Sequence, residues 1–389
     1  MHVLIAPDSF TGTLTATQAA EAMAEGWRRS APDDLLTLMP LSDGGPGFID
    51  VLATALRESR TVLTTAADPL GREVPAALLV READDGVPTA YIESAQAAGL
   101  HLLEADERNP AVTSTWGVGQ LLDAALREGA ERVVVGLGGS GTNDGGAGML
   151  ASLGAGSASA LARGGLALAD LDDGGLHGLE VVRQRFAGIE LLVATDVDSP
   201  LLGFHGASAV YAPQKGASPQ VAQALEAALG RFTEVVRRTL PEVPDLLTGQ
   251  ARRLDREPGA GAAGGLGYGL MLLGGRRVSG VDEVIRAVGL PEVIGAADLV
   301  VTGEGSFDWQ SLRGKVVAGV ARAALEAATP AVVIAGQTLV GRREAMTLGL
   351  SGTYAVAETP EEVEAAVADP VGTLAARAAR VAATWSPQR

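Results

Sequence analysis

The stretches that decide the fold class are "ADLVVTGEG" (297–305), "PAVVIAGQ" (330–337) and "GTYAVAE" (352–358). Each is a short apolar run, and helical patterns lie over 315–327, after 337 and at the end of the chain. Apolar strands that alternate with helices are typical of βαβ units with a parallel sheet. This part of the sequence therefore predicts an α/β fold.

The beginning of the chain has the same pattern. "HVLIA" (2–6) and "LLTLMPLSDGG" (35–45) predict strands, and "FIDVLATALRE" (48–58) predicts a helix. The alanine-rich stretch 15–29 predicts another helix, which Thr13 or Thr15 could cap. We expect both chain ends to form one flavodoxin- or Rossmann-like parallel sheet.

The middle of the chain predicts a second α/β domain inserted into the first. Strand patterns at 60–68, 74–82 and 88–94 lie close together and indicate hairpins, and a helix over 114–128 precedes strands at 132–139 and 189–196. The expected domains are 1–66 with 287–389, and 67–286, with the active site in the cleft between them.

Composition excludes several classes of protein. The net charge of −17 argues against a nucleic-acid surface, because a polyanion needs clustered cations. The absence of cysteine excludes disulfides and thiolate chemistry, and the four scattered histidines show no zinc spacing. No stretch offers the ~18 apolar residues of a membrane span, and the N-terminus reads as a strand rather than a signal peptide. We expect a cytoplasmic monomer or homodimer that acts on a small molecule.

Lysine usage singles out two positions. Among 30 basic residues only Lys215, in "PQKGAS", and Lys315, in "SLRGKVV", are lysines. An arginine-favouring genome explains the surface arginines but not these two positions. Because a compact ammonium differs chemically from a guanidinium fork, we expect at least one of them to contact an anionic ligand.

Five polar loops follow apolar strands. They are "APDSFTGTL" (6–14), "PLSDGGPGF" (40–48), "GLGGSGTNDGGAG" (136–148), "ATDVDSPLLG" (194–203) and "VTGEGSFDWQSLRGK" (301–315). In parallel α/β sheets the carboxyl ends of the strands face the ligand crevice, so these loops are the default site.

The glycine loop at 136–148 allows two interpretations. It lacks the Walker A ending and does not fit the dinucleotide fingerprint. Its uncovered N–H groups at the start of a helix could hold a phosphate. Alternatively, it is a tight strand-to-helix turn in which Asp144 caps the helix. The loop alone does not separate these interpretations.

The loops also carry acidic residues suited to phosphoryl transfer. Mg²⁺ commonly bridges one or two carboxylates to substrate phosphates, and the attacking hydroxyl needs an orienting group. In an extended "DVD" segment Asp196 and Asp198 would point to one face, where either metal binding or turn capping is possible.

The motifs in these loops, together with "APQKGAS" (212–218), resemble type 1 glycerate kinases in sequence and order, from residue 6 to about 320. The resemblance implies ATP-dependent phosphorylation of D-glycerate, typically on the 2-hydroxyl, with Mg²⁺. It also implies two α/β domains with the active site between them.

The resemblance assigns expected roles to individual residues. Expected catalytic residues are Asp8, Asp43, Asp196 and Lys315, with Asp196 and Asp198 near Mg²⁺. Expected ATP-binding residues are Gly138, Gly139, Ser140, Thr142, Asn143, Lys215, Gly303, Glu304 and Gly305. Expected substrate-binding residues are Ser9, Asp308, Gln310 and Ser311.

Three positions depart from the family pattern. Thr11 replaces a lysine, Pro46 a glutamate and Ser306 an arginine. Two lost cations would weaken the binding of a carboxylate or phosphate, at ~1.5–3 kcal/mol for each charge-assisted hydrogen bond. Two alternatives therefore stand beside a glycerate kinase. One is a kinase for a less anionic hydroxylated metabolite, and the other is a silent paralogue that binds a nucleotide or metabolite.

Overall fold

The computed structural model describes residues 1–10, 12–56, 58–82, 85–241, 249 and 252–386. The chain divides into two compact units. Unit 1 comprises Met1–Asp43, Asp50–Arg57 and Val281–Arg389, and unit 2 comprises Gly44–Ile49 and Glu58–Gly280. The domain boundaries expected from the sequence stay a prediction.

Unit 1 contains a five-stranded parallel sheet built from both ends of the chain, which confirms the expected fold class. Its order is β13 (Gly352–Ala355), β11 (Ala331–Ala335), β9 (Leu299–Thr302), β1 (His2–Ile5) and β2 (Leu35–Leu38). In chain order this is the 2-1-3-4-5 arrangement of flavodoxin-like sheets. The strand order therefore reverses between β1 and β9. Two short strands, β10 (Ser306–Phe307) and β12 (Gln337–Thr338), pair separately.

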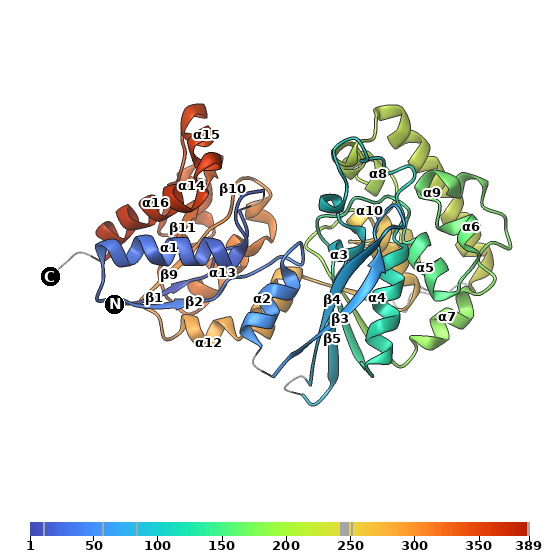
Figure 1. Cartoon of the computed structure of the whole chain (residues 1–389), viewed down its shortest axis with the longest axis horizontal. Coiled ribbons are helices and arrows are strands. Elements are labelled where there is room, and N and C mark those ends of the chain that lie inside the picture. Colours follow the sequence, from blue (N-terminus) through green and yellow to red (C-terminus); the bar gives the residue numbers. More distant parts are fainter. Residues whose placement is uncertain (11, 57, 83–84, 242–248, 250–251, 387–389) are drawn as a thin grey trace. The chain divides into compact units, whose positions relative to one another are not determined.

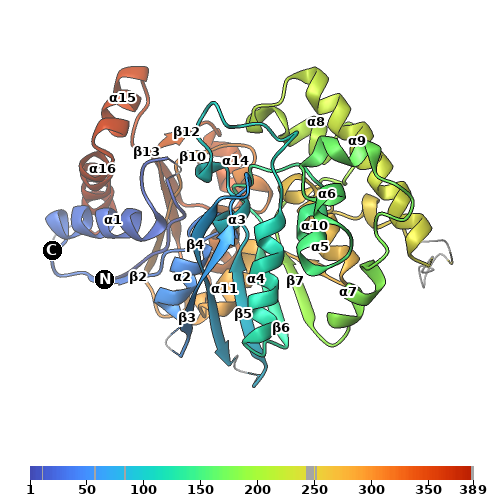
Figure 2. The same ribbon diagram turned by 45° about the vertical axis from the view of Figure 1, so that its right-hand side comes forward.

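Two long helices cover one face of this sheet (Figures 1 and 2). Helix α1 (Ala16–Ser30) begins at Thr15, whose side chain forms a capping box with Gln18. It packs so closely on α16 (Pro370–Trp385) that a Cβ at Gly26 would lie 2.0 Å from the carbonyl oxygen of Ala375. Alternate strand residues such as Val3, Val301 and Val332 form the core beneath these helices.

The remaining helices complete unit 1. Helix α13 (Val316–Glu326) packs against β9 and β11. The others are α2 (Phe48–Ala55), α11 (Gly280–Ala287), α12 (Leu290–Ile294), the 3₁₀ helix η5 (Ser311–Arg313), α14 (Arg342–Thr347) and α15 (Pro360–Ala368), with the start of α2 and Gly280 of α11 counted in unit 2.

Unit 2 contains a six-stranded mixed sheet. Its order is β3 (Arg60–Ala67), β4 (Glu73–Glu82), β5 (Pro88–Glu93), β6 (Arg132–Gly136), β7 (Glu190–Ala194) and β8 (Arg276–Val278). The first three strands pair antiparallel, as the hairpin patterns predict, and the last four pair parallel. The loops after β6 and β7 thus leave the same edge of the sheet.

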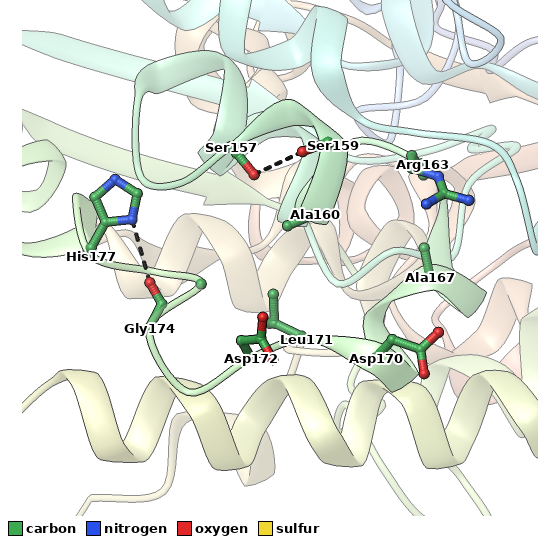
Figure 3. Close-up of a pocket in the computed structure, with 11 residues that line it drawn as sticks. Ser157, Ser159, Ala160, Arg163, Ala167, Asp170, Leu171, Asp172, Gly174 and His177 are labelled. Atoms are coloured by element: carbon green, nitrogen blue, oxygen red, sulfur yellow. Dashed lines mark hydrogen bonds between the residues drawn. The ribbon is translucent and has the colours of Figure 1, made fainter.

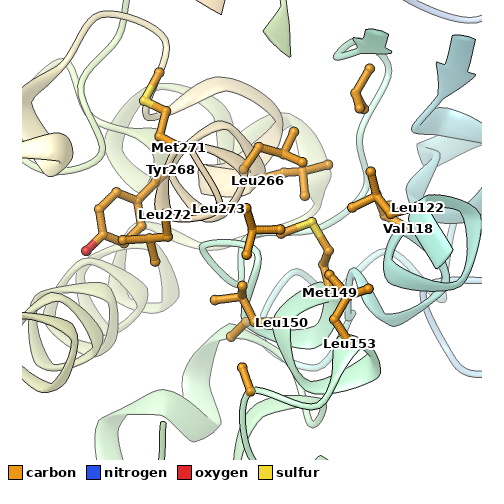
Figure 4. Close-up of a cluster of buried hydrophobic side chains, with 14 of the residues drawn as sticks. Val118, Leu122, Met149, Leu150, Leu153, Leu266, Tyr268, Met271, Leu272 and Leu273 are labelled. Atoms are coloured by element: carbon orange, nitrogen blue, oxygen red, sulfur yellow. The ribbon is translucent and has the colours of Figure 1, made fainter. Parts of the chain in front are cut away.

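The helices of unit 2 enclose a large apolar core, part of which Figure 4 shows. Its main helices are α4 (Trp116–Arg127), α5 (Ala147–Leu153), α7 (Leu179–Arg185), α9 (Pro219–Thr239) and α10 (Ala262–Leu272). The shorter ones are α3 (Ala95–Ala98), η1 (Leu100–Leu102), α6 (Ala158–Leu161), η2 (Gly165–Asp170), α8 (Ala207–Tyr211), η3 (Pro213–Lys215) and η4 (Leu254–Arg256). Among the described residues, no helix has both the length and the apolar character that a membrane crossing requires.

Candidate active site

In unit 1 the candidate site lies where the strand order reverses. The N–H of Asp8, just after β1, donates to the carbonyl of Gly303, just after β9, at 2.8 Å. The hydroxyl of Thr302 donates to the carbonyl of Ala6 at 2.8 Å and joins the same two segments. A Cβ at Gly303 would lie 2.1 Å from the carbonyl oxygen of Ile334, so only glycine fits there. In sheets with this order, ligands bind outside the carboxyl ends of the strands at this point.

Three acidic residues and one lysine interact electrostatically at these strand ends. Burial raises the pKa of Asp8 well above its usual range, and the nearby Asp43 and Glu304 carboxylates raise it further. The N–H of Ser9 donates to Asp8 at 2.7 Å and lowers this pKa, as does Lys315. Asp43, Glu304 and Lys315 therefore lie close enough to Asp8 to act electrostatically on its carboxyl group.

Glu304 is the least solvent-exposed of these carboxyls. It is 5% exposed, and burial raises its pKa to about 7 against the lowering effects of Ser311 and Lys315. Its Oε1 is buried without a hydrogen-bond partner among the described residues. Its carbonyl accepts from Gly336, and the carbonyl of Gly305 accepts from Gln337, which fix this loop beside β11. A buried acceptor of this kind is costly to leave unsatisfied, so it fits a donor or cation from a ligand.

Asp308, Gln310 and Ser311 form a turn that begins η5. The Asp308 carboxylate accepts from the N–H groups of Gln310 (2.8 Å) and Ser311 (3.3 Å). The N–H of Asp308 donates in return to the Ser311 hydroxyl at 3.0 Å. Their role as substrate-binding residues stays a prediction, because the structure shows them holding the loop.

In unit 2 the glycine loop after β6 has a crowded part and an accessible part. A Cβ at Gly146, which has φ +79°, would lie 2.9 Å from the Cα of Gly269, and one at Gly145 would lie 3.0 Å from Leu229. Asp144, which is fully buried, accepts from the N–H groups of Gly146 and Gly148. This half is the tight turn held by Asp144. The accessible half, at the partly exposed Gly138 and the exposed Gly139, is the part that could meet a phosphate.

The other polar residues of the loop face inwards. Thr142 and Asn143 are completely buried. The Thr142 and Ser140 hydroxyls are 3.1 Å apart, and the Asn143 amide donates to Ser208 at 3.0 Å. The Oδ1 of Asn143 is buried without a partner among the described residues. Contact between these two side chains and ATP remains a prediction.

Lys215 lies beneath the same loop. It is 2% exposed, and its Nζ donates to the carbonyl of Thr142 at 2.6 Å and to Ser140 Oγ at 3.4 Å. Burial lowers its pKa to about 7, although the Asp144 carboxylate opposes the shift. Lys215 therefore supports the loop backbone, whether or not it also reaches a phosphate.

The "DGGPGF" segment packs on the accessible half of the glycine loop. A Cβ at Gly139 would lie 2.7 Å from Cγ of Pro46, which is the position that departs from the family pattern. The Glu93 carboxylate, at the end of β5, accepts from the N–H groups of Gly47 (3.1 Å) and Ile49 (3.3 Å). Sequence reasoning misses Glu93, because it is one acidic residue at a strand end outside any motif.

Asp196 and Asp198 both face the segment at β8. The Ser279 hydroxyl donates to Asp196 at 2.7 Å, and Arg277 pairs with Asp198 at 2.5 Å. Asp198 is 77% exposed, so its carboxylate can exchange partners readily. Mg²⁺ commonly takes only one or two protein carboxylates, and this pair can supply them. Among the described residues no three acidic or histidine side chains form a metal cluster.

The sequence offers Arg72, Arg276 and Arg313 as arginines that could replace the cations missing at Thr11 and Ser306. Arg72 pairs with Asp68 and Glu107, and Arg276 pairs with Glu190. Both guanidinium groups therefore already form ion pairs with carboxylates of unit 2. Thr11 and the Arg313 side chain lie outside the described residues. At the third departure, Ser306 belongs to β10, and its carbonyl accepts from the Ser311 hydroxyl at 3.4 Å.

Unit 2 also has a further hollow, which Figure 3 shows. It has a volume of about 550 Å³ and is lined by part of the stretch 157–177, including Arg163 and His177. His177 bonds through Nδ1 to the carbonyl of Gly174, and Ser157 bonds to Ser159. None of the residues expected from the sequence to act in catalysis or binding lines it.

Comparison with known proteins identifies the family. A model of the glycerate kinase family matches residues 3–386. The chain is 37% identical over 395 residues to a glycerate kinase of Halalkalibacterium halodurans, covering 99% of this chain and 98% of that protein. It is 39% identical over 341 residues to glycerate 2-kinase of Escherichia coli, covering 86% and 85%. The crystal structure of a Salmonella typhimurium LT2 protein proposed to be glycerate kinase 2 matches with a TM-score of 0.74 and 36% identity, covering 99% and 98%. The chain therefore belongs to the glycerate kinase family.

Proposed function

We propose that this protein transfers the γ-phosphoryl group of ATP to a hydroxyl of D-glycerate, giving 2-phosphoglycerate. The observation that carries this proposal is the cluster of Asp8, Asp43, Glu304 and Lys315 at the strand reversal of unit 1. Family membership supports the kinase chemistry, and the relatives' names support the substrate.

In the proposed reaction, the hydroxyl oxygen forms a bond to the γ-phosphorus while the bond from that phosphorus to the β,γ-bridging oxygen breaks. The hydroxyl proton passes to a carboxylate, for which Asp8 is the best candidate and Asp43 the second. A raised pKa makes an ionised Asp8 a stronger base than an ordinary aspartate. The Lys315 ammonium counters the negative charge that gathers around this group.

The accessible part of the glycine loop is the part that could meet an anion, since Gly138 and Gly139 have no side chains, and the "DGGPGF" segment would form one wall of that site. Lys215 would hold this loop in shape through Thr142. Asp196 and Asp198 would hold Mg²⁺ together with phosphate oxygens, and the ion would supply charge neutralisation when bound.

A kinase for a less anionic hydroxylated metabolite is the second candidate. The observation in its favour is the charge of the unit 1 cluster, which has three acidic groups and one lysine. That balance is unfavourable for binding a carboxylate, and Ser306 supplies no cation to correct it.

The test is a coupled ADP-release assay with ATP, Mg²⁺ and D-glycerate, with glycerol and L-glycerate as matched alternatives. Phosphorus NMR of the product distinguishes the 2-phosphate from the 3-phosphate. Turnover that requires D-glycerate and yields the 2-phosphate supports the proposal. Faster turnover with an uncharged polyol favours the second candidate. ATP binding without turnover on any acceptor contradicts both and indicates a silent paralogue.

A further inference from the structure

Unit 2 contains a second cavity that the proposed reaction does not use. Its volume is about 210 Å³, and it lies between the C-terminal end of α9, the segment around η4, and α10. Apolar side chains, including Val236, Leu254 and Met271, form much of its wall. A benzene molecule fits an apolar cavity of ~150 Å³, so this one has room for a ring and one small polar group.

Positive charge surrounds this apolar wall. Arg183, Arg237, Arg252 and Arg253 all line the cavity, in a protein whose net charge is −17. Arg253 is neutralised by Asp255 through two hydrogen bonds of 2.9 Å, and Arg252 pairs with Glu257. Among the ion pairs of the described residues, none involves Arg183 or Arg237. The Nε of Arg237 donates to the carbonyl of Thr233 at 3.2 Å, and its charge lowers the pKa of Asp255. The lining therefore has an excess of positive charge.

Tyr268 adds a hydroxyl group to the lining of the cavity. The residue is 2% exposed, and its ring packs edge-to-face on Phe232 with centroids 5.9 Å apart. Figure 4 shows its hydroxyl pointing away from the apolar cluster formed by residues such as Leu266 and Met149. No other described residue hydrogen-bonds this hydroxyl, although Tyr268 lines the cavity. Burial raises the pKa of Tyr268, and Asp255 raises it further, so the hydroxyl remains a donor.

We propose that this cavity is a binding site for a small organic monocarboxylate with an aromatic or branched apolar body. The apolar body would lie against α9 and α10, and the carboxylate would accept from the Tyr268 hydroxyl and pair with Arg183 or Arg237. A neutral ligand would form no ion pair with Arg183 or Arg237. Inorganic phosphate would leave the apolar wall unfilled.

Isothermal titration calorimetry of the full chain with benzoate tests this site. We expect 1:1 binding with Kd of about 1 mM. We also expect at least roughly tenfold weaker binding of benzamide and of inorganic phosphate, since each lacks one of the two features. Equal binding of benzoate and benzamide would overturn the proposal, as would no benzoate heat up to ~20 mM, well above that Kd.

Three variants locate the binding, and a fourth serves as the control. Arg183→Gln and Arg237→Gln should each weaken benzoate binding by about 5–10-fold, and Tyr268→Phe by about 3–10-fold. Arg238→Gln makes the same charge change on α9, but Arg238 pairs with Asp173 and does not line the cavity. Benzoate binding that is unchanged in the first three variants, or equally weakened in Arg238→Gln, would place the ligand elsewhere. Unchanged melting temperatures and ADP-release rates would show that all four variants are folded.

Discussion

The N–H of Asp8 donates to the carbonyl of Gly303 at 2.8 Å. This bond joins the ends of two strands that lie 290 or more residues apart in the chain and pair side by side, with Val3 opposite Leu299. This hydrogen bond places the first acidic loop of the protein beside the loop that carries Glu304. The strand order reverses at this point, and the charges of the candidate site gather there.

Replacing Gly303 with alanine should disrupt this junction. The new Cβ would lie 2.1 Å from the carbonyl oxygen of Ile334, so the backbone must shift, at a cost of about 1–3 kcal/mol. Urea denaturation measures the loss. Gly230→Ala is the matched control, because nothing lies within 4 Å of its Cβ position in helix α9. The control should be neutral or more stable, and an equal loss in both variants would refute the packing argument.

Glu304→Gln should change how stability depends on pH. The carboxyl has its pKa raised to about 7 in the folded protein, so the folded state binds more protons than the unfolded state between pH ~4.5 and ~7. Wild-type stability therefore falls as pH rises through this window. The variant lacks this contribution and should gain up to about 3 kcal/mol relative to wild type by pH 8. Urea titrations at pH 5 and pH 8 measure it, and a constant difference between the two proteins would contradict the prediction.

Lys215→Met should remove a contribution to wild-type stability that changes with pH in the opposite direction to that of Glu304. Burial lowers the pKa of Lys215 to about 7, so the unfolded state binds more protons between pH 7 and ~10.5, and wild-type stability rises with pH. Methionine removes this rise and also the donor to the Thr142 carbonyl. We expect a loss of ~10–100-fold in kcat/KM for ATP, because the buried Thr142 carbonyl loses its donor and the loop loses that support. Thermal melts at pH 7 and pH 9.5 and ATP kinetics check both effects. A variant with wild-type values for both would show that Lys215 does not support the loop.

Asp196→Asn should raise the Mg²⁺ concentration needed for half-maximal activity. Removing one of two carboxylates weakens a metal site by about 10-fold or more. Asp198→Asn should have a smaller effect, because Asp198 is exposed and already pairs with Arg277. Activity measured against Mg²⁺ at fixed ATP separates the two variants. Identical Mg²⁺ curves for Asp196→Asn and wild type would exclude Asp196 as a ligand.

The two sheets follow from the sequence where strands are apolar and uninterrupted, as in β1, β9 and β11. Strand β8 goes unpredicted because its two arginines give no apolar run, and its pairing with β7 depends on tertiary contacts. Helix α9 also goes unpredicted, although Ser218 caps it and Pro219 starts it.

The sequence shows which loops carry the site residues, but it does not show how far apart their side chains lie in space. Sequence motifs indicate Asp8, Glu304 and Lys315, and the sheet order brings their loops together. The motif at 136–148 does not reveal that Thr142 and Asn143 face inwards, because glycine and hydroxyl residues suit both a phosphate cradle and a crowded turn. Packing against Gly269 and Leu229 decides which half is crowded, and these residues come from distant helices.

The most direct test of the central claim compares D-glycerate phosphorylation by wild type and by Asp8→Asn. The variant keeps the size of the side chain but cannot accept the hydroxyl proton. If Asp8 is the base, turnover should fall by ~10²–10⁴-fold while ATP affinity, measured by calorimetry, stays within about threefold. Asp282→Asn, which removes an exposed ion pair with Arg322 and makes the same chemical change elsewhere in unit 1, is the control and should keep most of the activity. Turnover of Asp8→Asn near the wild-type rate would contradict the account.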